Sequence, residues 1–421
     1  MTDWKKTTLG QVAQVFTGFP FKSNGYSEDP HDIKLLRGDN IAQGILRWDD
    51  AKKWPKSEYE KYDQYQLKED DVVLAMDRPW IGAGLKYSAV RKKDLPSLLV
   101  QRTARLRGSA ELDIIYLKYI IASPWFCKYI QSINTGSLVP HISSKQIKDF
   151  PVTLPSVQQQ KRLSSVLAAI DNKIDINNRI NAELEAMAKT LYDYWFVQFD
   201  FPDANGKPYK TSGGKMEYST TLKREIPAGW RASNILSLAN LLGGGTPTKT
   251  KPEYWNGSIP FFTPTDSDKN IYSLNTQDSI TDLGLKNSST RLFEKNTIFI
   301  TARGSVGRLA LNAVPMAMNQ SCYALKAKQG VSFAFLYFLT KELIHHLEVK
   351  ATGSVFNSII SNDIEYTYLA LPEDNDLIDK YAKKTELAFA KIELLTKENQ
   401  HLIALRDWLL PLLMNGQITV K

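Results

Sequence analysis

Apolar residues recur at alternating steps of four and three residues in two long stretches of the chain, one central and one near the end. This spacing is typical of a coiled-coil seam, because the apolar stripe of a single amphipathic helix is broader. The pattern predicts long helices over residues 156–196 and 373–416, each about 60 Å long at ~1.5 Å per residue. The seam positions are Leu163, Leu167, Ile170, Ile174, Asn177, Asn181, Leu184, Leu191, Ile392, Leu395, Asn399, Leu402 and Leu409.

The two seams are expected to bury each other in an antiparallel coiled coil. A linker at 197–229, which contains prolines and glycines, lets the chain turn back between them. Asn177, Asn181 and Asn399 would then be polar seam positions, which set the register at some cost in stability. The alternative is that these asparagines face solvent where the seam frays. The second seam is interrupted at Tyr381, Thr385 and Arg406, which leaves the extent of the pairing open.

The residues before each seam have mixed character. Short β-rich runs, such as 72–76 and 297–301, are separated by turn residues and by helical stretches. This mixture predicts α/β (α+β) globular domains over residues 1–155 and 230–372.

The two globular stretches also match each other in order. Trp4-Lys5 matches Trp230-Arg231, and residues 71–78 lie over 296–303, so that Arg78 meets Arg303. The matches continue with Thr135-Gly136-Ser137 over Thr352-Gly353-Ser354 and with Leu154-Pro155 over Leu371-Pro372. The offset between the matched residues shrinks gradually along the chain, as small deletions in loops would cause. The sequence therefore predicts a duplicated domain, with each copy followed by a long helix.

Two further segments make the pattern specific. The central segment 191–202 reads Leu-Tyr-Asp-Tyr-Trp-Phe-Val-Gln-Phe-Asp-Phe-Pro, and the segment 409–417 reads Leu-Leu-Pro-Leu-Leu-Met-Asn-Gly-Gln. With the repeated domains and helices, these segments resemble the specificity subunit of type I restriction–modification enzymes over essentially the whole chain.

The resemblance implies that each globular domain is a target-recognition domain that reads one half of a split DNA site. It implies that the helix pair is a spacer and the dock for two modification (methyltransferase) subunits, which two restriction subunits can join. S-adenosylmethionine and ATP would belong to those partner subunits. The recognition residues of relatives cannot be transferred, because these domains vary with the target sequence.

The predicted length of the helices indicates how far apart the two halves of the DNA site would lie. Two similar but non-identical domains at opposite ends of a stiff rod would read two different half-sites in inverted orientation. A rod of about 60 Å suggests one to two DNA turns between the half-sites, at about 34–36 Å per turn.

The distribution of charge favours a polyanionic partner. The formal net charge is +8, and residues 86–107 alone contain seven basic residues against the single acidic Asp94. Such a cluster would neutralise phosphates and make DNA binding steeply dependent on salt. The alternative is a solvated loop beside a strand. The candidate DNA-binding residues are Lys22, Arg78, Lys86, Arg91, Lys92, Lys93, Arg102, Arg105, Lys249, Lys251 and Arg303.

Arg78 and Arg303 each follow an apolar strand and precede a glycine turn. An arginine there could contact a phosphate or a guanine, or could bond carbonyls within the turn. The corresponding loops 17–22 and 243–249 contain glycine and lysine, which suits close approach to phosphates, but they also read as ordinary turns.

No catalytic, cofactor or metal site is predicted. The five histidines lack metal-ligand spacing, and no methyltransferase motif, nucleotide-binding loop or nucleophile–base pair is recognisable. We therefore expect a soluble cytoplasmic DNA-binding subunit that is not itself an enzyme. One alternative is a coiled-coil scaffold whose paired domains bind other proteins, and another is a nuclease with a cryptic site.

Overall fold

The computed structural model describes residues 4–133, 140–267, 270–351, 357–418 and 420, and the chain forms two compact units. The first unit contains residues 1–173 and 402–421, and the second contains residues 174–401. The matched motifs Thr135-Gly136-Ser137 and Thr352-Gly353-Ser354 lie outside the described residues. The division into the domain ranges named above remains a prediction.

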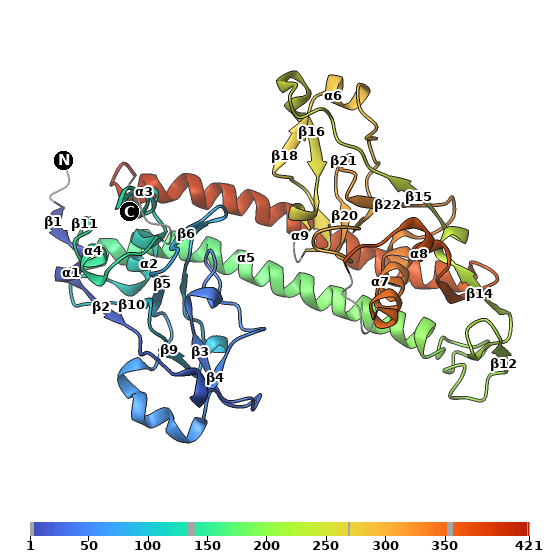
Figure 1. The fold of residues 1–421 in the computed structure, drawn as a ribbon, viewed down its shortest axis with the longest axis horizontal. Coiled ribbons are helices and arrows are strands. Elements are labelled where there is room, and N and C mark those ends of the chain that lie inside the picture. The colour runs from blue at the N-terminus through green and yellow to red at the C-terminus, as the bar shows by residue number, and fades with distance from the viewer. Residues whose placement is uncertain (1–3, 134–139, 268–269, 352–356, 419, 421) are drawn as a thin grey trace. The chain divides into compact units, whose positions relative to one another are not determined.

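The first unit is built on a four-stranded antiparallel sheet in the order β2-β10-β5-β8, with a three-stranded sheet β4-β3-β9 beside it (Figure 1). A third pair, β1 with β11, joins the start of the repeat to its end. The strands are β1 (Lys5–Thr8), β2 (Ala13–Thr17), β3 (Ile33–Leu36), β4 (Lys53–Trp54), β5 (Val72–Ala75), β6 (Trp80–Ile81), β7 (Gly84–Leu85), β8 (Tyr87–Ala89), β9 (Ser97–Leu99), β10 (Thr103–Gly108) and β11 (Pro151–Leu154). The helices of this repeat are α1 (Leu9–Val12), α2 (Ile114–Ala122), α3 (Pro124–Ile133) and α4 (Ser144–Lys148).

The second unit repeats this arrangement. A sheet in the order β15-β22-β19-β20-β17 lies beside a three-stranded sheet β18-β16-β21, and β14 pairs with β23. The strands are β12 (Met216–Ser219), β13 (Arg224–Pro227), β14 (Trp230–Asn234), β15 (Ala239–Gly243), β16 (Trp255–Phe262), β17 (Tyr272–Ser273), β18 (Asp278–Ile280), β19 (Ile298–Thr301), β20 (Leu309–Asn312), β21 (Ala317–Met318), β22 (Cys322–Ala327) and β23 (Tyr368–Pro372). The helices are α6 (Asp282–Lys286), α7 (Phe333–Lys350) and α8 (Ser361–Glu365).

Strand pairing confirms the duplication and corrects its register in one place. Leu106 of β10 lies opposite Val72, and Leu325 of β22 lies opposite Ile298. Val72 therefore corresponds to Ile298, one position later than the sequence comparison suggested. Consequently Asp77 corresponds to Arg303, and Arg78 corresponds to Gly304.

Backbone conformation supports the corrected register. Asp70 and its counterpart Asn296 have φ of 66° and 65°, and Arg78 and Gly304 have φ of 43° and 84°. Residues other than glycine rarely adopt the left-handed region. Two pairs of positive φ at equivalent positions therefore support the corrected register. The sequence comparison was wrong by one residue here because it aligned the two arginines.

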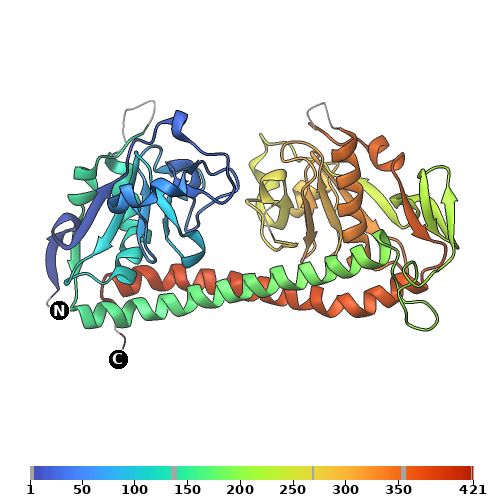
Figure 2. The ribbon, with the colours of Figure 1, turned by 90° about the horizontal axis from the view of Figure 1, so that it is seen from below.

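The predicted long helices are α5 (Val157–Tyr192), which ends in a π-turn at Asp193–Val197, and α9 (Asp376–Met414). In the second unit, Asn177 contacts Asn399 and Tyr381 contacts Ala188, so residue numbers rise along one helix as they fall along the other. In the first unit, Leu163 and Leu167 share an apolar cluster with Leu410 and Leu413. The predicted antiparallel pairing is thereby confirmed, and the helices lie side by side within each unit (Figure 2).

Two of the three polar seam positions, Asn177 and Asn399, are buried and bonded to each other. The Asn177 side-chain amide donates to Asn399 Oδ1 at 2.9 Å, and the Asn399 amide donates to Asn178 Oδ1 at 2.8 Å. The Asn181 amide reaches the Thr396 hydroxyl at 3.5 Å. These contacts favour the role in setting register over the solvent-facing alternative, because a shift of one helix along the other would leave buried amides unpaired.

The helix pairing also includes Tyr381 and Thr385, two of the residues that interrupt the apolar pattern of the second seam. Tyr381 and Thr385 are 0% and 2% exposed, and the Tyr381 hydroxyl donates to the Ala188 carbonyl at 2.9 Å. A large polar residue is tolerated there because its hydroxyl finds a backbone acceptor while its ring packs among aromatic neighbours.

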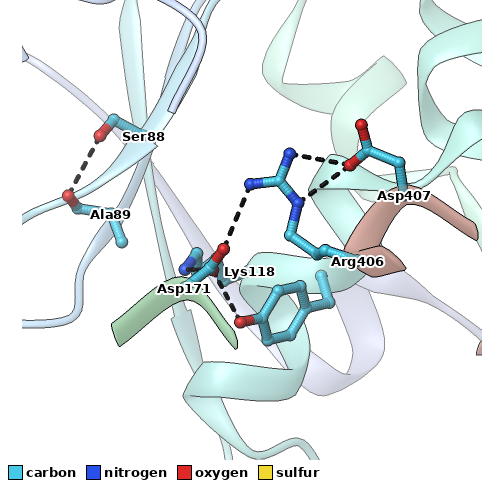
Figure 3. A network of polar contacts seen from close by, with 7 residues as sticks. Ser88, Ala89, Lys118, Asp171, Arg406 and Asp407 are labelled. Carbon is cyan, nitrogen blue, oxygen red and sulfur yellow. Dashed lines mark hydrogen bonds and ion pairs between the residues drawn. The ribbon is translucent and has the colours of Figure 1, made fainter. Parts of the chain in front are cut away.

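Arg406 joins an ionic network in the first unit (Figure 3). Asp171 of α5 accepts from the ammonium of Lys118 at 2.6 Å and from the hydroxyl of Tyr119 at 2.8 Å, both on α2. The Arg406 guanidinium of α9 contacts the same carboxylate at 3.2 Å. Burial by itself would raise the pKa of Asp171, but the charge of Lys118 and these hydrogen bonds hold it below its usual value. One carboxylate therefore links the first globular domain to both long helices.

Side chains between the two long helices should contribute more to the free energy of unfolding than side chains on their outer faces. Ile392 is 1% exposed within the core of the second unit, whereas Leu394 on the same helix is 58% exposed. Ile392→Ala is expected to cost about 2–5 kcal/mol in the free energy of unfolding, because it leaves a cavity. Leu394→Ala should change it by less than about 0.5 kcal/mol. Urea unfolding of the full chain measures both, and equal effects would contradict the packing described.

Candidate nucleic-acid interface

A polar cleft of about 400 Å³ opens in the first unit. It lies where three connections meet: the 3-10 turn Gly38–Asn40 after β3, the loop after β5, and the turn between β9 and β10. The lining residues are Phe21, Tyr26, Arg37, Gly38, Asp39, Asp77, Arg78, Lys86, Val100, Gln101 and Arg102. Four of these side chains are basic and two are acidic, which gives the cleft a positive balance.

Arg78 is held in an unusual conformation at the edge of this cleft. Its φ of 43° lies in the left-handed region, which is costly for a residue with a side chain. Its N–H donates to the Pro140 carbonyl at 2.7 Å, while the side chain is exposed. The strain places a guanidinium at a position where the other repeat has glycine. This favours contact with a ligand over bonding within the turn.

Asp77 bonds to the two side chains beside it. The Arg102 guanidinium contacts Asp77 Oδ2 at 2.7 Å, and His141 Nδ1 lies 2.5 Å from Asp77 Oδ1. Partial burial raises the pKa of Asp77, but the hydrogen bonds from Arg102 and His141 outweigh it and lower the pKa below its usual 3.8. The carboxylate is therefore ionised at neutral pH, and it holds both side chains in fixed positions.

Lys86 extends into the cleft from the segment between β7 and β8. Burial lowers the pKa of its ammonium, the charge of Arg78 lowers it further, and the charges of Asp39 and Asp77 counteract this. The ammonium is partly desolvated and lies near the Arg78 guanidinium, so an anionic ligand that replaces lost hydration would stabilise its charged form.

The predicted basic residues of the first unit separate into three groups. Arg78, Lys86 and Arg102 come together in the cleft. Arg91, Lys92 and Lys93 belong to a surface turn that does not line it, and Lys22 is exposed in the loop after Phe21.

The structure contradicts the prediction that Arg105 binds DNA. It is 3% exposed on the central strand β10, where its guanidinium donates to the carbonyls of Gln64 and Gln66 and lies over the ring of Phe16. Strand alternation explains this, because Arg102 precedes the strand whereas Arg105 lies within it, facing the covered side. The burial withdraws Arg105 from the candidate interface.

In the second unit the predicted residues lie on the surface but are less concentrated. Arg303 is exposed directly after β19, and Lys249 is exposed in the loop after β15. The Lys251 ammonium donates to the Tyr254 hydroxyl at 3.1 Å and lies over the same ring.

The glycines of the two matching loops have a packing role. A Cβ on Gly18 would lie 2.1 Å from the Val100 carbonyl oxygen, and one on Gly244 would lie 2.1 Å from that of Asn319. Val100 and Asn319 are themselves equivalent in the two repeats. These glycines therefore permit strand contact, which favours the turn interpretation over close approach to phosphates.

Comparison with known proteins identifies the family. A family model described as "Type I restriction modification DNA specificity domain" matches residues 1–186 and 227–402. The chain belongs to this family.

Individual relatives agree with the family model over long alignments. The type I restriction enzyme HindI specificity subunit of Haemophilus influenzae is 22% identical over 99% of this chain and 100% of its own length. The MjaIX specificity subunit of Methanocaldococcus jannaschii is 26% identical over 73% of this chain and 69% of its own length. The crystal structure of a type I restriction–modification S subunit from M. genitalium has the same fold, with a TM-score of 0.54 at 15% identity over 98% of this chain and 96% of that one.

Membership of this family makes the chain a DNA specificity subunit. Such subunits are the non-catalytic recognition components of type I restriction enzymes, so the scaffold alternative is not favoured. Among the described residues, no cluster of metal-ligating side chains occurs, and no helix is long and apolar enough to cross a membrane.

Several residues of the specificity subunit's cleft were missed in the sequence. Arg37, Asp39, Asp77 and Gln101 carry no motif, and three separate connections bring them together. His141 lacks metal-ligand spacing, and because its counterpart in the second repeat is Ser358, no shared role distinguishes it. In recognition domains that read different sequences, such a mismatch could instead have been taken as a signal.

The two arginines at positions 102 and 105 should respond differently to the same substitution. Arg105→Met removes the donors for two carbonyls and is expected to cost about 1–3 kcal/mol in the free energy of unfolding. Arg102→Met breaks an exposed ion pair, since 64% of the side chain is exposed, and should cost less than about 1 kcal/mol. Urea unfolding of each variant measures the difference, and a reversed order would contradict the assignment of Arg105 to the core.

Proposed function

We propose that the two recognition domains read the two different halves of a bipartite DNA sequence, the first through the cleft described above and the second through the equivalent loops. The proposal rests on one observation. The equivalent loops of the two repeats have the same backbone hydrogen bonds, which we call the shared frame, but they present different side chains. A shared frame gives a shared way of approaching the duplex, and different side chains give different base preferences.

The 3-10 turn after the first strand of the three-stranded sheet illustrates the frame. The Arg37 N–H donates to Asn40 Oδ1 at 3.0 Å in the first unit, and the Thr263 N–H donates to Asp266 Oδ2 at 2.8 Å in the second. The turn is thus closed in the same way. Its outward side chains differ, however, with Arg37 in one repeat and Thr263 in the other.

The two other loops differ more strongly. After the central strand, Asp77 and Arg78 stand where the second repeat has Arg303 and Gly304. Before β10, Arg102 stands where the second repeat has Ser321. Arginine favours guanine through its O6 and N7, carboxylates accept from the cytosine amino group, and lysine contacts phosphates as a compact charge. The halves of the target should therefore differ in base sequence.

The helix pair provides the proposed spacer and the dock for partner subunits. Seam residues such as Leu167, Ile392 and Leu395 are less than 4% exposed, so their side chains serve pairing within the chain and cannot themselves contact a partner. Docking therefore falls on the outer helix faces. In the proposed complex, two modification subunits bind S-adenosylmethionine, and two restriction subunits that use ATP can join, in the cytoplasm.

Salt dependence of DNA binding tests the cleft. If Lys86 neutralises one phosphate, Lys86→Gln should reduce the slope of log K against log salt by about 0.9. Lys207→Gln removes the same charge from an exposed position of the linker at 197–229, outside the cleft and the long helices, and should leave the slope unchanged. Titrations of both variants in the presence of the modification subunits give the comparison, and equal slopes for Lys86→Gln and the unaltered chain would exclude Lys86 as a phosphate contact.

Exchange of a whole domain tests the division of the target. Replacing residues 1–150 by those of a relative with another specificity should change only one half of the modified motif. Genome-wide mapping of modified bases, with and without the chain, reports the motif. Changes in both halves would refute the assignment of one half-site to each domain.

A further inference from the structure

One exposed side chain is the same in both repeats although its neighbours differ. Gln101 lies in the turn between β9 and β10, and Gln320 lies in the turn between β21 and β22. The strand register makes them equivalent, because Leu106 and Leu325 hold the same place in the two sheets. Gln101 lines the cleft of the first unit.

The backbone around this glutamine is held alike in both repeats. The Met76 N–H donates to the Arg102 carbonyl at 2.9 Å, and the Ala302 N–H donates to the Ser321 carbonyl at 2.8 Å. Each turn is thereby anchored to the loop after the central strand. The glutamine directly precedes the anchored residue, so its backbone occupies the equivalent position in both domains.

Among the residues that the structure describes, no contact common to both repeats accounts for the shared glutamine. In the second unit, the Thr246 hydroxyl donates to Gln320 Oε1. In the first unit, the residue equivalent to Thr246 is Pro20, which has no hydroxyl to donate. A structural requirement for glutamine would need a partner in both repeats, so the identity points to a ligand that both domains have in common.

We propose that Gln101 and Gln320 each read one adenine, at the equivalent position of the two half-sites. A glutamine amide can accept from the adenine N6 amino group and donate to adenine N7, a pairing that no other base matches in the major groove. This inference rests on the proposed reading of DNA by the two domains, and it adds a base that the two otherwise different half-sites share.

The surroundings of each glutamine fit this assignment. Arg102 follows Gln101 and is tied to Asp77, whereas Ser321 follows Gln320 and Arg303 stands where Asp77 would be. The flanking contacts therefore differ between the domains while the central amide is constant. In the second unit, Thr246 occupies one lone pair of Gln320 Oε1 and leaves the other lone pair and both amide hydrogens for a base.

The test uses the full chain assembled with its modification subunits. Duplexes containing the mapped motif carry 7-deazaadenine, which lacks N7, at one adenine at a time. The unaltered complex should lose about threefold to tenfold in affinity at one adenine in each half-site, the range of the one hydrogen bond to N7 that is removed while the N6 contact remains. Gln101→Ala should abolish that sensitivity in one half-site only, and Gln320→Ala in the other half-site only.

Gln329→Ala, at an exposed turn outside the cleft, is the matched control and should keep both sensitivities. The inference is overturned if either glutamine variant retains both sensitivities, or if the adenine affected lies at different positions in the two half-sites. Failure of the proposed function looks different, because the unaltered chain would then confer no bipartite motif. A bipartite motif with unchanged sensitivities in the variants refutes only the role of the glutamines.

Discussion

Neither unit closes its apolar core with residues of its own repeat alone. In the first unit, Leu410 and Leu413 near the end of the chain share a cluster with Leu9 and Leu117. In the second unit, Tyr192 at the end of α5 packs among Phe335 of α7 and Tyr381 of α9. Burial of apolar surface is the main term that stabilises a fold, so antiparallel pairing of the two helices is the constraint on which both domains depend.

At one pair of equivalent places, the two domains contact the helices through different chemistry. Asp113 and Ser332 cap α2 and α7 at the same point, so Lys118 corresponds to Tyr337 and Tyr119 to Phe338. The first domain uses Lys118 and Tyr119 to bind Asp171, whereas the second uses Tyr337 and Phe338 to pack on Phe389. At these equivalent places an ionic contact in the first domain takes the position of an aromatic contact in the second. Either kind of contact can stabilise a partly buried junction between a domain and a helix.

The cleft shows why such domains can diverge in specificity without losing their fold. Its three loops are held by backbone hydrogen bonds, by cap residues such as Asn40 and Asp266, and by the close packing that Gly18 and Gly244 permit. None of these restraints needs the outward side chains at positions 77, 78 and 102. Those positions can therefore change with the DNA sequence to be read, while the glutamine between them stays.

The sequence by itself determined the repeat, the long helices and their antiparallel pairing, because heptad spacing and an ordered series of matches depend only on local pattern. It also selected Lys86 and Arg102, since charge density is visible along the chain, whereas Arg78 was selected through a match between the repeats that is off by one residue. Only the tertiary structure decided that Arg105 is a core residue and that Arg78 corresponds to Gly304 and not to Arg303. It also decided that Asp77 and Gln101 line the cleft, with His141 bonded to Asp77. The reason is physical: strand alternation decides which basic residues face outward, and loops far apart in sequence meet only when the sheets form.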